Sequence, residues 1–273
     1  MTLAAKSAWV VGGAGFLGSA LVELCCSAGW SALVVDPASS DSAWVGQGAA
    51  VPSLSGAALL PSPAVVFFCA STRGGDATAY RRAYLEPVLQ ALPLAPRARF
   101  VFCSSTSLYG AEGGVSESSP TPARSERHHA LLSAEHAVLR SGGVVARLAA
   151  LYGPGRCELL RRHLAGEPRL SGNPERMLNY VHVQDAARAL FLLADARALQ
   201  HGVYNICAES FTWRQAYALL EQLTGVHPSQ AIAPAGRRGM ADHRVLAERV
   251  RSELGWTPSI YFSDFVKDSL PLA

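Results

Sequence analysis

The chain of 273 residues lacks several features that would assign it to a function class. It has no run of about 18 apolar residues, so we expect no membrane span. Its net charge of +3 comes from scattered arginines rather than from a basic run, which gives no indication of nucleic-acid binding. No acidic tail and no solenoid repeat is present. Apolar residues make up 49 %, enough to form the core of one large α/β domain, or of a nucleotide domain with a smaller lobe.

The six cysteines form no C-x-x-C pair and no regular disulfide spacing. Four of them lie inside apolar runs, where a free cysteine behaves as a small hydrophobic residue. A reducing compartment fits this usage better than secretion. The apolar stretch near the N-terminus is interrupted by glycines and does not resemble a signal peptide. We therefore expect a cytoplasmic protein, and we expect no metal site.

Residues 8–36 carry the clearest motif. An apolar run at 9–11 predicts a buried strand, and Gly12, Gly15 and Gly18 follow it at G-x-x-G-x-x-G spacing. Such glycines allow a tight turn, backbone approach to a pyrophosphate and close helix–strand packing. A helix over 16–28, which begins with Phe16 and Leu17, then points its N-terminal amides at the phosphates. The sequence therefore predicts a dinucleotide-binding turn.

The second strand, at 31–35, ends at Asp36. This acid comes 18 residues after Gly18, where a carboxylate hydrogen-bonds the adenosine ribose diol. The loop after it holds no Arg or Lys to bind a 2′-phosphate. We therefore expect NAD as the cofactor in preference to NADP.

Two further apolar runs, at 64–70 and 99–103, predict central parallel strands. The first ends in Ala70 and Ser71, and the second leads into Ser104, Ser105 and Thr106. Ligands of open parallel sheets lie at the carboxyl ends of the strands. Hydroxyls there either cap a loop or serve a site, and both interpretations stay open.

The remaining elements are weaker. We expect a strand near 49–54, a helix over 76–92 that Pro87 kinks or splits, and a helix over 126–140 capped by Ser125. A strand over 144–150 and one over 203–207 should complete the sheet. Further helices are predicted at 157–165, 186–198, 212–224 and 242–254.

Taken in order, these landmarks resemble the extended short-chain dehydrogenase/reductases, the NAD-dependent epimerase/dehydratase superfamily. The resemblance implies an α/β fold: a Rossmann doubly wound parallel sheet over 1–150 that binds NAD(P), and a small substrate lobe over 151–273 with segments that return to the core. The substrate is often a nucleotide sugar. The residues that carry the resemblance are Gly12 to Gly18, Asp36, Ser104 to Gly110, and the stretches 151–155, 180–185, 203–206 and 254–258.

One part of the family's pattern is missing. The family's chemistry rests on a Ser or Thr, matched here by Ser105, and on a Tyr-x-x-x-Lys pair on one helix. When this helix is counted back from Glu135, Arg127 stands at the Tyr position and Leu131 at the Lys position. The chain's only lysines are Lys6 and Lys267. The chain thus resembles an atypical branch of the family.

Other residues then have to supply the chemistry. Ser105 would polarise a substrate oxygen, and the proton would be moved by His128 or by Tyr109, of which the histidine titrates closer to neutrality. Arg127 stays protonated and suits an anion better than acid/base work. For the cofactor the resemblance implies Ala70, Ser71 and Ser104 beside the glycine turn. For the substrate it implies Thr106, Tyr152 and Arg156.

Two functions fit these residues. The first is an NAD-dependent oxidoreductase, epimerase or dehydratase with a non-standard acid/base set, acting on a small or nucleotide-linked hydroxy, carbonyl or imine substrate. The second is a redox-inactive dinucleotide-binding sensor or scaffold. The hydroxyl cluster at 104–109 favours the enzyme. The resemblance also implies a homodimer that pairs through the helices at 76–92 and 126–140.

Overall fold

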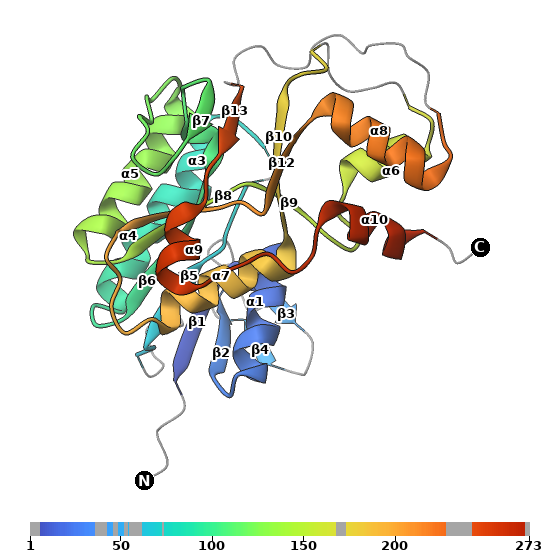
Figure 1. The fold of residues 1–273 in the computed structure, drawn as a ribbon. Helices are drawn as coiled ribbons and strands as arrows, with labels where there is room; N and C mark the ends of the chain where they lie inside the picture. Colours follow the sequence, from blue (N-terminus) through green and yellow to red (C-terminus); the bar gives the residue numbers. More distant parts are fainter. Residues whose placement is uncertain are drawn as a thin grey trace.

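A computed structural model describes residues 6–35, 43–45, 49–51, 54, 62–72, 74–167, 173–227 and 242–270. Its centre is a parallel sheet of six strands in the order β11-β8-β6-β5-β1-β2 (Figure 1). The strand order reverses between β1 and β5, as in doubly wound nucleotide-binding folds. The strands are β1 (Ser7–Val11), β2 (Ser31–Val35), β5 (Val65–Phe68), β6 (Arg99–Ser105), β8 (Val144–Leu148) and β11 (Val203–Ile206).

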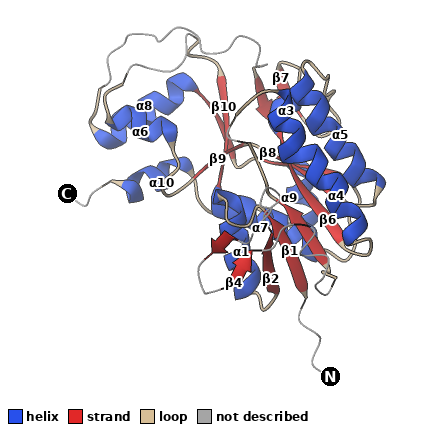
Figure 2. Cartoon of the chain, turned by 180° about the vertical axis from the view of Figure 1, so that it is seen from behind, coloured by secondary structure: helices blue, strands red, loops and turns tan. Residues whose placement is uncertain are grey.

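Both faces of the inner strands are buried, which is why most of them appear in the sequence as mainly apolar runs. Along β5, Val65 and Phe67 pack into one core cluster while Val66 and Phe68 pack into the other. The first face is covered by α1 (Phe16–Ser27), α7 (Val183–Asp195) and α9 (Glu248–Leu254). The second face is covered by α4 (Glu86–Leu94) and α5 (Glu126–Arg140), and α3 (Ala77–Tyr80) lies beside α5 (Figure 2).

Helices α3 and α4 follow each other directly in the chain and are joined by a π-helical turn over Arg81–Leu85. Pro87 explains the interruption, because it has no N–H to donate to the carbonyl of Ala83 four residues earlier. At the edge of the turn, the Glu86 N–H instead reaches back five residues to the Arg81 carbonyl. The expectation that Pro87 disturbs this helix is confirmed, although the helix runs on to Leu94.

Beyond β8 the chain builds a smaller lobe beside the carboxyl end of the sheet. A three-stranded sheet in the order β12-β10-β9 packs with three helices around Tyr152, Leu220 and Phe262. These elements are β9 (Ala150–Tyr152), β10 (Met177–His182), β12 (Glu209–Thr212), α6 (Glu158–Leu164), α8 (Trp213–Thr224) and α10 (Phe262–Ser269). Two segments of this half return to the main body, since β11 joins the large sheet and α7 packs against α1.

Several elements differ from the sequence-based expectations. The predicted helix over 242–254 was wrong in its first part: His243–Val245 form β13, which pairs with β7 (Gly113–Val115), and α9 starts only at Glu248. His243 and Val245 are buried on either side of exposed Arg244, which is the period of a strand. The expected strand near 49–54 ends at Val51 and pairs antiparallel with β3 (Ala43–Val45), outside the large sheet.

Helix α7 also begins earlier than expected, at Val183, because the His182 side chain serves as its N-cap. In the described part of the chain, no helix is long and apolar enough to cross a membrane.

Candidate active site

The glycine turn after β1 is closed so tightly that side chains are excluded. Gly12 has a φ of +79°, and a Cβ built on it would lie 2.7 Å from the backbone of Ala70. A Cβ on Gly18 would lie 2.3 Å from the carbonyl oxygen of Gly12. Each glycine is therefore required by the close approach of another backbone segment. The turn sits beside the end of β5, as the spacing of the motif predicts.

Helix α1 begins at this turn and leaves its N-terminal amides open toward solvent. Gly15 is its N-cap and supplies no side chain, and the first turn of the 12-residue helix contains no acidic residue. Phe16 and Leu17 follow Gly15, and all three line the same cavity. An anion placed there would meet N–H donors and the positive end of the helix dipole.

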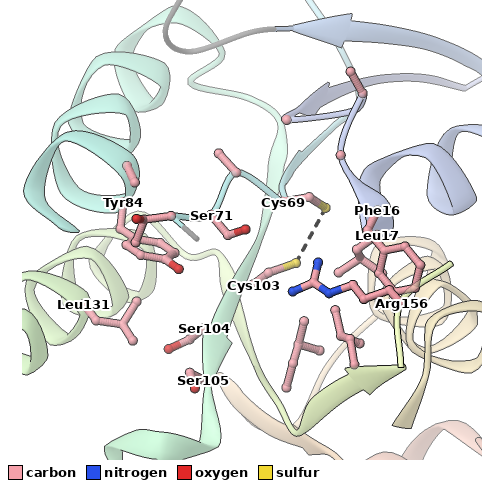
Figure 3. Close-up of a pocket in the computed structure, with 18 of the residues that line it drawn as sticks. Phe16, Leu17, Cys69, Ser71, Tyr84, Cys103, Ser104, Ser105, Leu131 and Arg156 are labelled. Carbon is pink, nitrogen blue, oxygen red and sulfur yellow. Dashed lines mark hydrogen bonds between the residues drawn. The ribbon is translucent and has the colours of Figure 1, made fainter. Parts of the chain in front are cut away.

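The cavity has a volume of about 650 Å³ and runs along the carboxyl ends of the parallel strands (Figure 3). One end is bounded by the glycine turn and by Val34 and Val35 of β2. The other end is bounded by Ser104 and Ser105 of β6 and by Leu148 of β8. Ala70 and Ser71, directly after β5, lie between the two ends. This is the position and size expected of a dinucleotide crevice.

Asp36, the expected ribose ligand, lies outside the described residues. Its neighbour Val35 is fully buried and bounds the cavity, so β2 ends at the wall where the adenosine half of a dinucleotide would lie.

The hydroxyls that follow β6 are held in different ways. Ser104 is buried and donates to the carboxylate of Glu135 on α5. Ser105 caps a short 3₁₀ turn: it accepts from the Ser107 N–H at 3.1 Å and donates to the Ser107 hydroxyl at 2.8 Å. Thr106 is absent from the described cavity lining and donates to the Leu148 carbonyl at 3.3 Å. Ser104 and Ser105 are thus the hydroxyls of this loop that bound the cavity.

Glu135 belongs to a buried polar network beneath the site. Arg147 of β8 grips its carboxylate with two hydrogen bonds of 3.0 and 2.7 Å. The same guanidinium donates to the Tyr109 hydroxyl at 3.3 Å, and that hydroxyl donates to Asn205 Oδ1 at 2.6 Å. Ser104 is therefore connected, through one carboxylate, to a chain of fixed partners in the core.

Tyr109 does not reach the cavity. Its side chain is 2 % exposed, and both functions of its hydroxyl are used within the network. Burial raises the pKa of the phenol, and the hydrogen bond from Arg147 offsets only part of this rise. Its placement corrects the hypothesis that Tyr109 moves the substrate proton.

Arg127 and His128 are also absent from the described lining of the cavity. The Arg127 guanidinium lies 5.8 Å from the centre of the Tyr80 ring on α3. His128 Nδ1 accepts from the backbone of Arg124 at 3.4 Å, and burial together with nearby Arg124 lowers the pKa of the imidazole. Both side chains are thus turned toward the α3 side and the loop before α5. Leu131, one helical turn after Arg127 on α5, does bound the cavity.

Of the expected substrate residues Arg156 and Tyr152, one lines the cavity and the other does not. Arg156 lines the cavity, and its guanidinium lies 5.1 Å from the centre of the Phe16 ring. Tyr152 is buried in the small lobe, where its hydroxyl donates to the Ile260 carbonyl at 3.0 Å. Of the two, only Arg156 faces the space in which a ligand would bind (Figure 3).

The cavity-lining residues that sequence reasoning missed include Cys69, Arg82, Tyr84 and Cys103. Cys69 directly follows β5 and Cys103 lies in the neighbouring strand β6, with their sulfur atoms 3.6 Å apart, and the sequence shows them only as parts of apolar runs. Arg82 and Tyr84 belong to the π turn. Pro87 was the signal for that irregularity, but it does not reveal which side chains turn inward.

Solved structures with the same fold include UDP-glucose 4-epimerases. The enzyme of Thermotoga maritima superposes with a TM-score of 0.81 over 96 % of both chains, at 23 % identity. The enzyme of Thermus thermophilus, solved with NAD, gives 0.79 over 96 % of this chain and 97 % of its own, at 21 % identity. At these identities the likeness establishes the Rossmann-type fold and its small lobe.

Sequence comparison identifies the family. Protein YeeZ of Escherichia coli K12 is 34 % identical over 181 residues, which is 63 % of this chain and 63 % of its own length. The family model for the NAD-dependent epimerase/dehydratase family matches residues 8–207, from β1 to the end of β11. This match includes the glycine turn, both serines and Arg156. The chain therefore belongs to the NAD-dependent epimerase/dehydratase family.

Proposed function

We propose that the protein is an NAD-dependent oxidoreductase, epimerase or dehydratase that acts on a small or nucleotide-linked hydroxy, carbonyl or imine substrate. The observation that carries this proposal is the continuous cavity from the glycine turn to Ser104 and Ser105. At the β6 end of this cavity Ser105 would meet a substrate beside the cofactor, and Arg156 supplies a cation to the same cavity.

The residues present fit NAD. Gly12 and Gly15, with the first amides of α1, would hold the pyrophosphate, and the lack of a side chain at Gly12 and Gly18 lets the turn close against Ala70 and against the start of the helix. The wall at Val34 would receive the adenosine, with Asp36 on the ribose diol, and Ala70 and Ser71 would lie along the dinucleotide. Bound NAD supplies a hydride acceptor. The protein's part is to fix its orientation and to handle the substrate's proton.

On the substrate side, Ser105 would turn its O–H from the exposed Ser107 hydroxyl to the reacting oxygen, and Arg156 would bind a substrate anion. Ser104 is already committed to Glu135 and would shape the wall instead. A nucleotide-linked sugar is a substrate of suitable chemistry, because its phosphates would suit Arg156. The UDP-glucose named for related solved structures makes it a sensible first compound to test.

Calorimetric titration with NAD⁺ and NADP⁺ tests the cofactor assignment. We expect NAD⁺ to bind more tightly, by roughly 1–3 kcal/mol, because Asp36 accepts hydrogen bonds from a free ribose diol and repels a 2′-phosphate. Equal or tighter binding of NADP⁺ would contradict this choice. Failure to bind either cofactor would contradict the proposed function.

Ser105→Ala tests the enzyme assignment, with Ser133→Ala on α5 as a matched control that lies outside the described cavity lining. If Ser105 polarises the reacting oxygen, its loss should lower kcat by about 10²–10³. The control should leave kcat unchanged. NAD that binds but never changes redox state, across sugar-nucleotide, ketone and imine substrates, would support the redox-inactive alternative.

We also propose that the protein forms a homodimer through α4 and α5 in the cytoplasm. The two helices pack together on one face of the sheet, and Leu89 of α4 is 51 % exposed there. A second copy would cover this leucine and build a four-helix interface. Light scattering should then give twice the monomer mass, and Leu89→Arg should return the monomer. The cysteines of the chain, all described and all free thiols, are compatible with the cytoplasm.

A further inference from the structure

Tyr84 is the one tyrosine among the described residues that line the cavity. Its ring is fixed from two sides: it lies 5.3 Å from the ring of Tyr80 and meets the ring of Phe102 edge-on at 6.5 Å. Figure 3 shows its hydroxyl directed toward the strand that carries Cys103 and Ser104. The phenol is therefore held in place by packing and points into the space where a ligand would bind.

The π turn accounts for this orientation. A wider turn changes the angular position of the residues it contains, and such turns are frequent at functional sites. Here three consecutive residues, Arg82, Ala83 and Tyr84, all bound the cavity. In a regular α-helix, successive side chains are about 100° apart, so three in a row would not share one narrow face. Pro87, which causes the turn, thus acts on the site from outside it.

The hydroxyl of Tyr84 is free to donate. The backbone of Thr72, which faces the cavity from the loop after β5, opposes the rise in the pKa of this hydroxyl. Among the described residues, no acceptor receives the Tyr84 O–H. Tyr109 differs in this respect, because its O–H is already given to Asn205. Of the two phenols near the site, Tyr84 is the one that is able to bond a substrate.

The position along the cavity favours the reacting half of the dinucleotide. Adenosine would lie against β2, and the pyrophosphate at the turn after β1. The nicotinamide then lies beyond the switch point, toward β6 and β8. Tyr84 packs on Phe102 of β6, and Leu131 and Cys103 bound the same part of the cavity. The phenol is thus on the side where hydride transfer would take place.

We propose that Tyr84 is a catalytic residue that donates a hydrogen bond, and then its proton, to the carbonyl oxygen of the substrate. This inference rests on the proposed function, because it requires a dinucleotide as the hydride donor. As the hydride adds to the carbonyl carbon, the C=O double bond opens and its oxygen takes the Tyr84 proton. The products are an alcohol, the oxidised dinucleotide and a phenolate, which recovers its proton from water.

The surroundings of the Tyr84 phenol favour the reduction of a carbonyl over the oxidation of an alcohol. Burial, followed by the effect of Tyr80, raises the pKa of Tyr84 to about 12, so the group is protonated at neutral pH. Cys103 on β6 also faces it, while Arg82 and Arg156 are the cations that line the same cavity. A protonated phenol is ready to give a proton to a carbonyl. It is a poor base for an alcohol, so oxidation should be slower than reduction at neutral pH and should speed up as pH rises.

The other titratable groups of the cavity are less suited. The bond to Cys69 and burial raise the pKa of the Cys103 thiol well above its usual value. The two thiols face each other at 3.6 Å. The guanidinium groups of Arg82 and Arg156 cannot release a proton near neutrality.

Fluorine NMR of protein labelled with 3-fluorotyrosine tests the contact without a known substrate. The chain has eight tyrosines, and Tyr84→Phe identifies the resonance of Tyr84 by its loss. We expect NAD⁺ to shift this resonance more than those of Tyr80 and Tyr109. We also expect a lower titration midpoint with NAD⁺ than with NADH, because the nicotinamide of NAD⁺ carries a positive charge.

Two results separate the inference from the proposed function. If calorimetry shows that NAD⁺ binds while the Tyr84 resonance stays unmoved, the role of Tyr84 is overturned and the cofactor assignment stands. If NAD⁺ does not bind at all, the proposed function fails first. Tyr84→Phe keeps the ring that packs on Phe102, so the variant should fold.

Turnover gives a second readout. With a carbonyl substrate, Tyr84→Phe should lower kcat for reduction by about 10²–10⁴ and leave the Kd for NADH unchanged. Tyr80→Phe, on the same helix but outside the described cavity lining, is the matched control and should retain kcat. Equal losses in both variants would indicate a structural role for this helix and would overturn the inference.

Discussion

The pair of Glu135 and Arg147 allows a sharp stability prediction. Their side chains are 1 % and 7 % exposed, and two hydrogen bonds join them. Glu135→Gln keeps the shape and an oxygen for Ser104 but removes the negative charge, which leaves the Arg147 guanidinium buried without a counter-charge. Breaking a buried pair in this way costs about 3–5 kcal/mol. At about 2–4 °C per kcal/mol for a chain of this size, the Tm should fall by roughly 6–20 °C.

Denaturant unfolding of the wild type and the variant gives the free-energy difference directly. The control is Glu158→Gln, which removes one partner of an exposed ion pair with Arg161 and should leave the free energy of unfolding nearly unchanged. Replacing both Glu135 and Arg147 with Met should recover much of the lost stability, because no uncompensated charge remains. A loss below about 1 kcal/mol for Glu135→Gln would refute the reasoning, since it would mean that water reaches Arg147.

Two further predictions concern the turn and the small lobe. Gly18→Ala should abolish NAD⁺ binding by calorimetry, because its Cβ would lie 2.3 Å from the Gly12 carbonyl, whereas Gly114→Ala, with its nearest atom 3.7 Å away, should bind normally. His182 caps α7 through Nδ1, and burial lowers the pKa of its imidazole, so the unfolded chain takes up this proton at higher pH than the folded one. The contribution of His182 to the free energy of unfolding should therefore be fully present above about pH 6.5 and should decrease at lower pH, by at most about 1.4 kcal/mol per pH unit. In His182→Asn this dependence on pH should be weaker.

The fold could be predicted where local pattern and burial agree. Helix α5 is an example, because Ser125 caps it as expected and it spans Glu126–Arg140. The inner strands of the large sheet are buried on both faces, and so they appeared as mainly apolar runs, although Arg147 interrupts that of β8. β13 escaped prediction because its short alternating pattern is also compatible with the start of a helix. Its pairing with β7 joins segments that are far apart in the chain.

The site could be predicted only in part, for a physical reason. Glycines that are required by backbone contacts leave a fixed spacing, and the cavity lies beside them. A hydrogen bond between polar side chains that are far apart in the chain produces no such spacing in the sequence. Tyr109 is occupied by Asn205 and Arg147, which are 96 and 38 positions away in the sequence. The sequence of the hydroxyl-rich loop around Tyr109 therefore gives no sign that its hydroxyl already has two hydrogen-bond partners.

The missing Tyr-x-x-x-Lys pair and the position of Tyr84 have a common explanation in our proposal. Leu131 stands where the family's lysine would lie, so this wall of the cavity is apolar and holds no ammonium to lower the pKa of a phenol. Arg127 stands at the Tyr position and lies on the ring of Tyr80, which in turn packs against Tyr84. Helix α5 thus supports the neighbouring helix, and the π turn of that helix presents the phenol. A phenol presented without a lysine stays protonated, which is the state that reduction of a carbonyl requires.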